Sequence, residues 1–249
     1  MIEVKNLSFS FGDHEVLKNV SAKLYEGKFT AILGRNGSGK STFLKVIAGI
    51  IKYKKGEVRI FGKDLRQIKD SERAKIIGYL PQFHTATFPY KVLDVVLTGR
   101  APYVFSMPKK FDIYKSEEAL DAVGISHLVD RPYSELSGGE RQLVMMARVL
   151  AQEPKILLLD EPLTHLDLTN QYHMMELIKN HLSKGITVIA VLHEPNMAFK
   201  YADEFILLKR GQIIELSYHF KPWHQDILKE LYDIELNTIN FNDKAYIIP

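Results

Sequence analysis

The sequence predicts an α/β protein: a mainly parallel sheet flanked by helices, with an antiparallel β-subdomain at the N-terminal end and an inserted α-helical subdomain. Apolar runs at residues 29–33, 156–159 and 187–192 are typical of strands that a parallel sheet buries on both faces. A glycine-rich turn and then a helical pattern follow the first run. Residues 92–152 are largely helical in pattern and separate two of the core strands, which indicates the inserted subdomain.

The composition is that of an ordinary globular protein. The 249 residues allow one large domain or two small ones, and 46% of them are hydrophobic while 25% are charged. No cysteine is present, which excludes disulfides and thiolate metal sites. A net charge of +3, with no stripe of Lys and Arg among stacking aromatics, argues against a nucleic-acid partner. The apolar runs are too short to cross a bilayer, and the first residues lack the profile of a signal peptide.

Five short apolar runs begin the chain, with glycine-containing turns between several of them. They are Ile2–Val4, Leu7–Phe9, Val16–Leu17, Val20–Leu24 and Phe29–Leu33. We expect an antiparallel sheet here that leads into the core. Phe11 stands just before this sheet turns, where its ring could lie against a purine base. The alternative is a core or edge aromatic, which spacing alone favours.

The glycine-rich turn, Gly34 to Ser41, fits the pattern G-x-x-x-x-G-K-[ST] between a strand and a helix. Glycines let the backbone wrap closely around a phosphate, and the helix N-terminus behind them favours negative charge. Lys40 adds an ammonium group for the terminal phosphates, and Ser41 adds a hydroxyl for Mg²⁺. A ligand-free turn is the weaker alternative, because all four fixed positions are filled. The sequence therefore predicts a nucleoside triphosphate site, formed by Gly34, Arg35, Asn36, Gly37, Ser38, Gly39, Lys40, Ser41 and Thr42.

Further elements follow in order along the chain. A helix is expected over Thr42–Ile51, a strand over 56–62 between two glycines, and a charged helix over 64–77. Ile77–Pro81 is a strand that proline ends, and Gln82 comes directly after it.

The inserted helical block has its own start and stop signals. We expect Ser116 to cap one helix and Gly124 to end it. Ser137 and Glu140 stand at the spacing of a capping box at the start of the next helix. A helix cap with no ligand would by itself explain the spacing of Ser137 and Glu140. The two glycines between these residues, Gly138 and Gly139, would also expose N–H groups at the positive end of the helix. This motif therefore predicts a second anion site.

Two adjacent carboxylates, Asp160 and Glu161, end the next buried strand. Ligands of parallel sheets bind at the carboxyl ends of the strands. We therefore expect Asp160 to hold Mg²⁺ through water and Glu161 to take the proton from an attacking water. A solvated strand end is the alternative. His193 ends the strand at 187–192 and is predicted to contact phosphate, although a lone histidine is more often structural. Asp167 is predicted to cap the helix that begins after it.

With these motifs in place, the chain resembles the ATP-binding subunit of an ABC transporter over nearly its whole length. The matching segments are Walker A at 34–42, a Q-loop at Gln82, the LSGGE signature at 136–140, Walker B at 156–161, a D-loop at 164–167 and the switch histidine His193. The resemblance implies that Glu161, His193 and Gln82 are catalytic, and that Ser41, Gln82 and Asp160 hold Mg²⁺.

The same resemblance implies how ATP is bound. Phe11 would stack on adenine, and two chains would face each other head to tail. Each ATP would then lie between one chain's Walker A loop and the other chain's Ser137, Gly138 and Gly139, with Asp167 also in the nucleotide site.

Within this family the chain is most similar to importer subunits for iron-siderophore, haem, cobalamin and related metal chelates. The residues that carry this similarity are Val92–Arg100, Ala151–Pro154, Thr164–Leu168, Val191–Ala198 and Tyr201–Asp203. Leu163 and Glu194-Pro195 depart from the family's usual residues. The alternatives are an importer ATPase for another small solute, metal ion or oxyanion, and a non-transport soluble ABC ATPase.

The resemblance also implies an organisation and partners. We expect a single ABC ATPase domain, with a nucleotide-binding core and β-subdomain at about 1–82 and 153–216, a helical subdomain at about 83–152 and a C-terminal extension at 217–249. A second copy, integral membrane permease subunits and, indirectly, an extracytoplasmic substrate-binding protein are the expected partners, without nucleic acid. The chain would be cytoplasmic, peripheral on the inner face of the cell membrane. Phe88 or Tyr90 is predicted to contact a helix of the permease; the alternative is that these aromatics pack the helical insertion onto the core.

Overall fold

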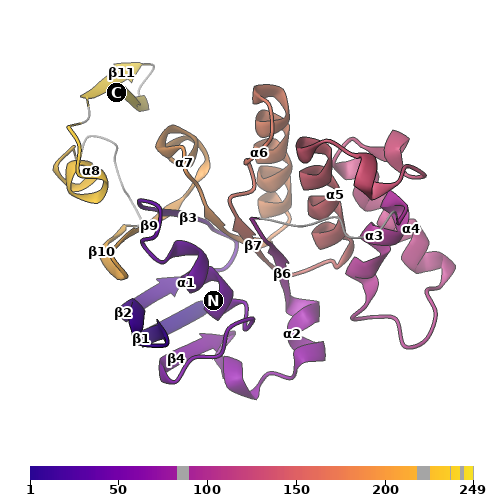
Figure 1. Ribbon diagram of the computed structural model, residues 1–249, viewed down its shortest axis with the longest axis horizontal. Helices are drawn as coiled ribbons and strands as arrows, with labels where there is room; N and C mark the ends of the chain where they lie inside the picture. The colour runs from indigo at the N-terminus through magenta and orange to yellow at the C-terminus, as the bar shows by residue number, and fades with distance from the viewer. Residues whose placement is uncertain (83–89, 218–224, 236, 242–243, 249) are drawn as a thin grey trace. The chain divides into compact units, whose positions relative to one another are not determined.

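The computed structural model describes residues 1–82, 90–217, 225–235, 237–241 and 244–248, and the chain divides into two compact units (Figure 1). The first unit comprises Met1–Ile68 and Thr187–Pro249, and the second comprises Lys69–Ile186. Both units combine helices with strands, which confirms the α/β fold class. The subdomain boundaries expected from the sequence stay a prediction.

The first unit begins with an antiparallel sheet in the order β2-β1-β4-β5. Its strands are β1 (Ile2–Phe11), β2 (His14–Leu24), β4 (Lys55–Ile60) and β5 (Lys63–Asp64). The sequence predicted this sheet but divided β1 and β2 into four short strands, which was wrong. The register between β1 and β2 shifts at bulges, and Asn6 and Asn19 adopt left-handed backbone there, with φ of 49° and 52°. These polar residues interrupt the apolar pattern without ending the strands.

The second sheet of this unit runs in the order β10-β9-β3-β8. Its strands are β3 (Phe29–Leu33), β8 (Thr187–Val191), β9 (Glu204–Lys209) and β10 (Gln212–Ser217). β3 is parallel to both β8 and β9, while β9 and β10 form the expected hairpin. Every residue of β3 and β8 is buried, which explains their unbroken apolar sequences. Helices α1 (Lys40–Ile47) and α7 (Pro195–Tyr201) follow β3 and β8.

The rest of the first unit is a C-terminal extension. It contains α8 (Gln225–Tyr232) and an antiparallel hairpin of β11 (Asn237–Phe241) and β12 (Lys244–Ile248). This agrees with the helix and weak strands that the sequence indicates. A 3₁₀ turn at Leu65–Gln67 completes the unit's regular structure.

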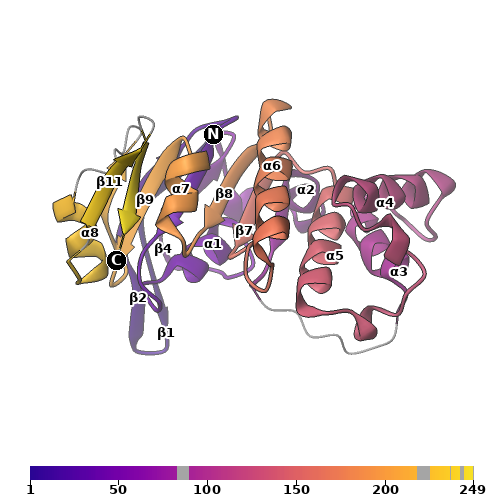
Figure 2. The same ribbon diagram turned by 90° about the horizontal axis from the view of Figure 1, so that it is seen from above.

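In the second unit, β6 (Ile77–Leu80) pairs in parallel with β7 (Ile156–Asp160). The helices are α2 (Asp70–Ile76), α3 (Val92–Leu97), α4 (Lys110–Ala122), α5 (Gly138–Ala151) and α6 (Leu168–Ser183), with 3₁₀ turns at Thr98–Arg100, Ser126–Leu128 and Tyr133–Glu135. α3, α4 and α5 pack together, as Figure 2 shows. They lie between β6 and β7 in the sequence, which is the predicted helical insertion. Within the described ranges, no helix is long and apolar enough to cross a membrane.

The predicted cap at Ser116 is wrong. α4 begins six residues earlier, at Lys110, and the Asp112 carboxylate accepts a hydrogen bond of 2.9 Å from the Lys109 N–H at the helix start. Ser116 lies buried inside α4, where its hydroxyl donates to the Asp112 carbonyl at 2.9 Å. Gly124, with φ of 76°, follows the end of this helix as predicted.

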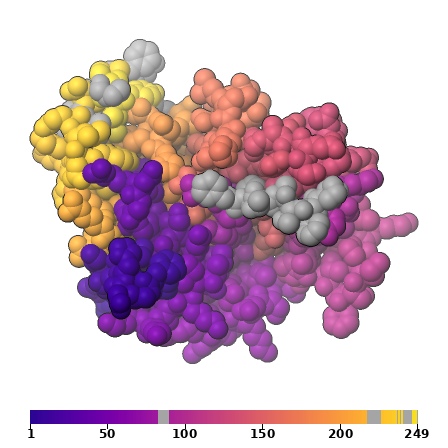
Figure 3. All heavy atoms as spheres, viewed as in Figure 1, coloured from indigo at the N-terminus to yellow at the C-terminus, as the bar shows by residue number. Residues whose placement is uncertain are grey.

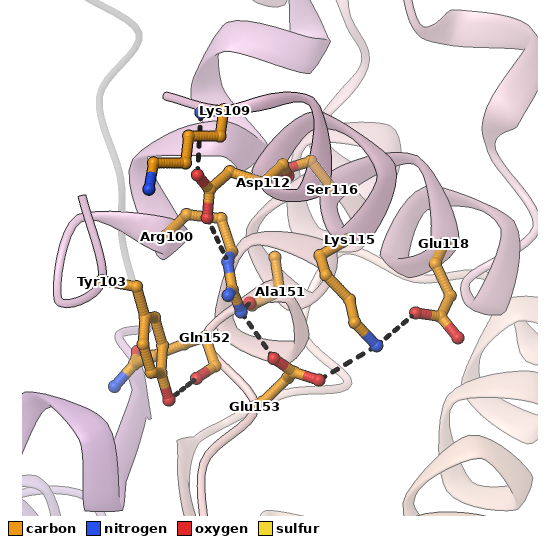
Figure 4. Close-up of polar contacts among 10 residues, drawn as sticks. All are labelled: Arg100, Tyr103, Lys109, Asp112, Lys115, Ser116, Glu118, Ala151, Gln152 and Glu153. Carbon is orange, nitrogen blue, oxygen red and sulfur yellow. Dashed lines mark hydrogen bonds and ion pairs between the residues drawn. The ribbon is translucent and has the colours of Figure 1, made fainter. Parts of the chain in front are cut away.

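Arg100 connects three segments of the second unit (Figure 4). Its side chain is almost completely buried, and it donates to the carboxylates of Asp112 (3.2 Å) and Glu153 (2.7 Å) and to the Ala151 carbonyl (2.7 Å). The guanidinium also lies 4.3 Å from the ring centroid of Tyr103. These contacts join the turn after α3 to α4 and to the end of α5.

Candidate functional site

The phosphate loop between β3 and α1 has the backbone that its glycines predict. Gly37 and Gly39 have φ of 76° and 103°, which side chains rarely permit. At Gly34 a Cβ would lie 2.1 Å from the Leu208 carbonyl oxygen, so the loop could not pack against β9 with a larger residue. The Lys40 ammonium is buried and donates to the carbonyls of Gly34 (2.7 Å) and Arg35 (2.9 Å). The loop therefore wraps around its own lysine.

The other predicted site residues of the first unit lie near strand ends or in the first turn of α1. Phe11, the last residue of β1, is 56% exposed and meets Phe9 edge-on at a centroid distance of 4.8 Å. Because its ring is exposed, Phe11 is not a core residue, and the ring is available to a ligand. His193 is exposed just after β8, and Pro195 occupies the first turn of α7 as expected. Ser41 and Thr42 belong to the first turn of α1.

In the second unit, the predicted carboxylates end β7 and are both buried. Asp160 accepts a hydrogen bond of 3.2 Å from the Tyr79 hydroxyl. Burial, with the nearby Asp160 charge, raises the pKa of Tyr79, so its hydroxyl stays a hydrogen-bond donor. Glu161 accepts a hydrogen bond of 2.6 Å from the Gln82 amide nitrogen and one of 3.4 Å from the Thr164 hydroxyl. The structure thus brings the predicted residues Gln82 and Glu161 together.

Glu161 has left-handed backbone, with φ of 54°, although it is not a glycine. A residue in this region costs roughly 1–3 kcal/mol and persists only where its surroundings fix it. The two hydrogen bonds to its side chain and the burial of the strand before it supply that constraint. Strain of this kind concentrates at functional sites, so the backbone supports the importance of Glu161 independently of the motif.

The signature segment forms the predicted capping box at the start of α5. The Ser137 hydroxyl accepts from the Glu140 N–H (3.3 Å), and the Glu140 carboxylate accepts from the Ser137 N–H (2.8 Å). The Ser137 N–H, and then its side chain, hold the pKa of Glu140 below its usual value, so the cap is ionised at neutral pH. Ser137 and Gly138 are exposed, which leaves this helix start open to a ligand.

The D-loop lies beside the signature segment. A Cβ on Gly138 or Gly139 would come 3.4 Å from the His165 Cβ or 3.1 Å from the His165 carbonyl oxygen. His165 itself has left-handed backbone, with φ of 66°. Asp167 caps α6 as predicted, because its carboxylate accepts from the Asn170 N–H at 2.8 Å.

The sequence did not indicate one of these partners. Tyr79 contacts the predicted site residue Asp160 only through the folded chain, whereas Thr164 and His165 belong to the predicted D-loop segment. Tyr79 had a weak signal, as the polar residue of a strand that ends beside Gln82.

The predicted metal ligands carry oxygen atoms in each unit taken by itself. Ser41 offers a hydroxyl in the first unit, and Gln82 and Asp160 offer an amide oxygen and a carboxylate in the second; oxygen ligands suit Mg²⁺ and not the softer metals. Among the described residues, no cluster of three or more His, Cys, Asp or Glu is arranged to hold a metal.

Comparison with known proteins agrees with this site. A family profile described as ABC transporter matches residues 17–164. The chain is 35% identical, over 99% of its length and 98% of the relative, to the "Probable iron chelatin transport ATP-binding protein" of Helicobacter pylori strain J99. It is 39% identical to the hemin import ATP-binding protein HmuV of Gloeobacter violaceus, over 86% of this chain and 80% of that one.

Solved structures agree as well. An inward-facing conformation of a transporter described as metal-chelate type has a TM-score of 0.85 and 30% identity, covering all of this chain and 96% of the other. A dimeric ATP-binding cassette in a post-hydrolysis state, bound to ADP and Pi, has a TM-score of 0.77 and 31% identity over 87% and 98% of the two chains. With a phosphate loop, an LSGGE helix start and an Asp-Glu strand end in one chain, this protein belongs to the ABC transporter family as an ATP-binding cassette.

Proposed function

We propose that this chain is the ATP-hydrolysing subunit of an importer that takes up a metal chelate, with an iron chelate such as haem or a ferric siderophore as its cargo. The observation that carries the ATPase proposal is the buried Glu161, which stands after Asp160 and accepts a hydrogen bond from Gln82. The iron cargo rests on the named relatives, which include an iron chelatin transport protein and a hemin import protein.

The proposed binding roles follow from the geometry of each unit. The loop residues Gly34–Thr42 would surround the ATP phosphates, and the Lys40 ammonium would exchange its two carbonyl partners for phosphate oxygens. Phe11 offers an exposed ring for adenine. His193 would contact the terminal phosphate.

Mg²⁺ would neutralise charge on the phosphates, held by Ser41, Gln82 and Asp160. The orientation of Gln82 supports this role. Its amide nitrogen donates to Glu161, so its carbonyl oxygen is the atom that can face a cation. Gln82 would therefore connect the metal ion to the Glu161 carboxylate, and Glu161 would take the proton from the attacking water.

A second copy of the chain would complete each ATP site. The chain carries a phosphate loop and a signature helix start, and each is an anion site that needs one ligand. Ser137 and Gly138 are exposed, as a partner's nucleotide requires, and Gly139 and Asp167 would lie near the same nucleotide. The dimeric cassette found among the similar structures supports assembly of two copies.

The remaining proposed partners are membrane permease subunits and, through them, a substrate-binding protein outside the membrane. This arrangement would hold the chain on the inner face of the cell membrane. The segment after Arg100 exposes several large apolar side chains: Tyr103, Phe105, Met107, Phe111 and Tyr114. Exposed apolar groups that gather in one segment mark interaction sites. We call this segment, residues 103–114, the docking segment. Tyr90 is also exposed, whereas Phe88 lies outside the described residues.

The function can be tested by reconstituting the chain in lipid vesicles with the membrane subunits that copurify with it. ATP supplied on the side of the membrane that carries this chain should drive haem or a ferric siderophore to accumulate on that side. Vesicles with the Glu161→Gln chain should accumulate neither. Accumulation of cobalamin or another solute instead would contradict the iron cargo. Hydrolysis without any accumulation would contradict the importer.

The docking segment can be tested with Phe105→Ser in the same vesicles. Phe105 is fully exposed, so its removal should leave the fold and the basal ATPase rate unchanged while weakening assembly with the membrane subunits. The matched control is Ile50→Ser, an exposed apolar residue in the first unit. Equal assembly of both variants and the unmodified chain would place the permease contact elsewhere.

A further inference from the structure

A carboxylate of the C-terminal extension binds the phosphate loop. Asp233, one residue after α8, accepts a hydrogen bond of 2.6 Å from the guanidinium of Arg35. Its other oxygen accepts from the ammonium of Lys209, at the end of β9, at 2.7 Å. Arg35 and Asp233 are 198 residues apart in the sequence. In the space-filling view, yellow atoms of the extension lie directly beside violet atoms from the N-terminal fifth of the chain (Figure 3).

Asp233 is held in place and does not depend on Arg35 for its position. Leu228 and Leu231 of α8 are completely buried, and Lys209 also donates to the Glu230 carbonyl. Farther along the extension, the Asn196 side chain forms two hydrogen bonds with the backbone of Ile247, at 3.0 Å and 2.8 Å. The extension is therefore attached to α7 and to β9, and it presents Asp233 to the loop from a fixed support.

The backbone and the side chain of Arg35 are held differently. The Arg35 carbonyl accepts from the Lys40 ammonium (2.9 Å) and the Ser38 N–H (3.2 Å), whereas its guanidinium donates to Asp233. A pocket of about 190 Å³ adjoins the loop, lined by residues 35–38 together with Lys209, Arg210 and Asp233. The Arg35 side chain borders this open space, so packing alone does not fix its direction. The side chain of Arg35 is more than half exposed, which makes its bond to Asp233 the contact that fixes its direction.

The charges of this cluster fit a supporting role. Hydrogen bonds from Lys209 and then Arg35 hold the pKa of Asp233 below its usual value, so the carboxylate is ionised at neutral pH. Two cations face the one anion, which compensates its charge beside the loop. Asp233 therefore does not present an uncompensated negative charge to an incoming phosphate.

We propose that Asp233 is a positioning residue for ATP: it holds Arg35, and with it the first half of the phosphate loop, in the conformation that receives the phosphates. Phosphate binding depends on N–H groups that already point inward, and a loop that must be ordered at binding loses affinity. The C-terminal extension, to which the sequence assigns no motif, thereby becomes part of the nucleotide site. This inference rests on the proposed use of ATP.

The test is ATP affinity in Asp233→Ala and Asp233→Asn, measured on the full chain by calorimetry and by the KM and kcat of hydrolysis. We expect the alanine variant to raise the Kd and KM about three- to tenfold with kcat nearly unchanged, as the loss of an exposed ion-pair network allows. Asparagine keeps an acceptor oxygen and should give a smaller increase. Raising the salt concentration should weaken ATP binding more in the unmodified chain than in Asp233→Ala, because only the former has the pair to screen.

The matched control is Glu235→Ala, which removes a neighbouring carboxylate of the extension that pairs with Lys229 and not with the loop. It should leave Kd and KM unchanged. Unchanged or lowered Kd in Asp233→Ala, or an equal loss in Glu235→Ala, would overturn the positioning role while leaving the ATPase proposal intact. Failure of the unmodified chain to bind ATP would overturn the proposed function, and this inference with it.

Discussion

Replacing Glu161 with glutamine should lower the rate of ATP hydrolysis by about 10²–10⁴-fold and leave ATP binding intact, because removal of a positioned base has an effect of this size. Glutamine has nearly the same shape and can still pair with Gln82, but it cannot take a proton from water. The measurements are phosphate release at saturating ATP and the equilibrium binding of ATP.

The control is Glu135→Gln, which changes an exposed carboxylate of the same unit that has no proposed role. It should hydrolyse ATP at the rate of the unmodified chain. Hydrolysis near that rate in Glu161→Gln would contradict the assignment of the base, whereas lost ATP binding would mean that Glu161 serves the nucleotide or its metal instead.

Replacing Arg100 with alanine should reduce the free energy of unfolding by about 3–5 kcal/mol, the effect of breaking a buried ion pair. Arg100 is 2% exposed and Asp112 is 6% exposed, so the variant would leave a buried carboxylate without its cation and the Ala151 carbonyl without its donor. Chemical denaturation of the full chain gives the measurement. The ring centroids of Tyr103 and Phe111 lie 4.3 Å and 5.7 Å from the same guanidinium, so the docking segment should also lose order.

The control for this prediction is Lys91→Ala, which breaks an exposed pair with Asp130 and should have an effect of about 0–1 kcal/mol. The double variant Arg100→Met with Asp112→Leu should recover part of the stability, because it removes both buried charges together. An Arg100→Ala chain as stable as the control would show that the pair contributes little.

Much of the site could be predicted because its chemistry is local in the sequence. The pattern from Gly34 to Ser41 requires a particular backbone, and φ values at Gly37 and Gly39 agree with it. The Ser137 cap is similar, since both of its hydrogen bonds lie within three residues. Burial on both faces likewise makes β3, β7 and β8 recognisable as apolar runs.

The remaining features depend on residues that only the fold brings together. The bond between Gln82 and Glu161 spans 79 residues, and the bond between Arg35 and Asp233 spans 198, so no short pattern contains either pair. Serine is typical of helix starts, which is why the sequence predicted a cap at Ser116. In the fold Ser116 is buried inside the helix, where its hydroxyl donates to a carbonyl one helical turn earlier. The bulges of β1 and β2 similarly divided two strands that hydrogen bonding makes continuous.

We propose that two copies of this chain together form the ATP sites and that Glu161 is the base for hydrolysis in each. The most direct measurement is the mass of the Glu161→Gln chain in solution, with and without MgATP, together with the number of nucleotides bound. We expect monomers without ATP and, with it, a dimer that holds two ATP molecules. Adding Ser137→Arg should prevent the dimer but not ATP binding to the monomer. A Glu161→Gln chain that binds ATP and remains a monomer would contradict the claim.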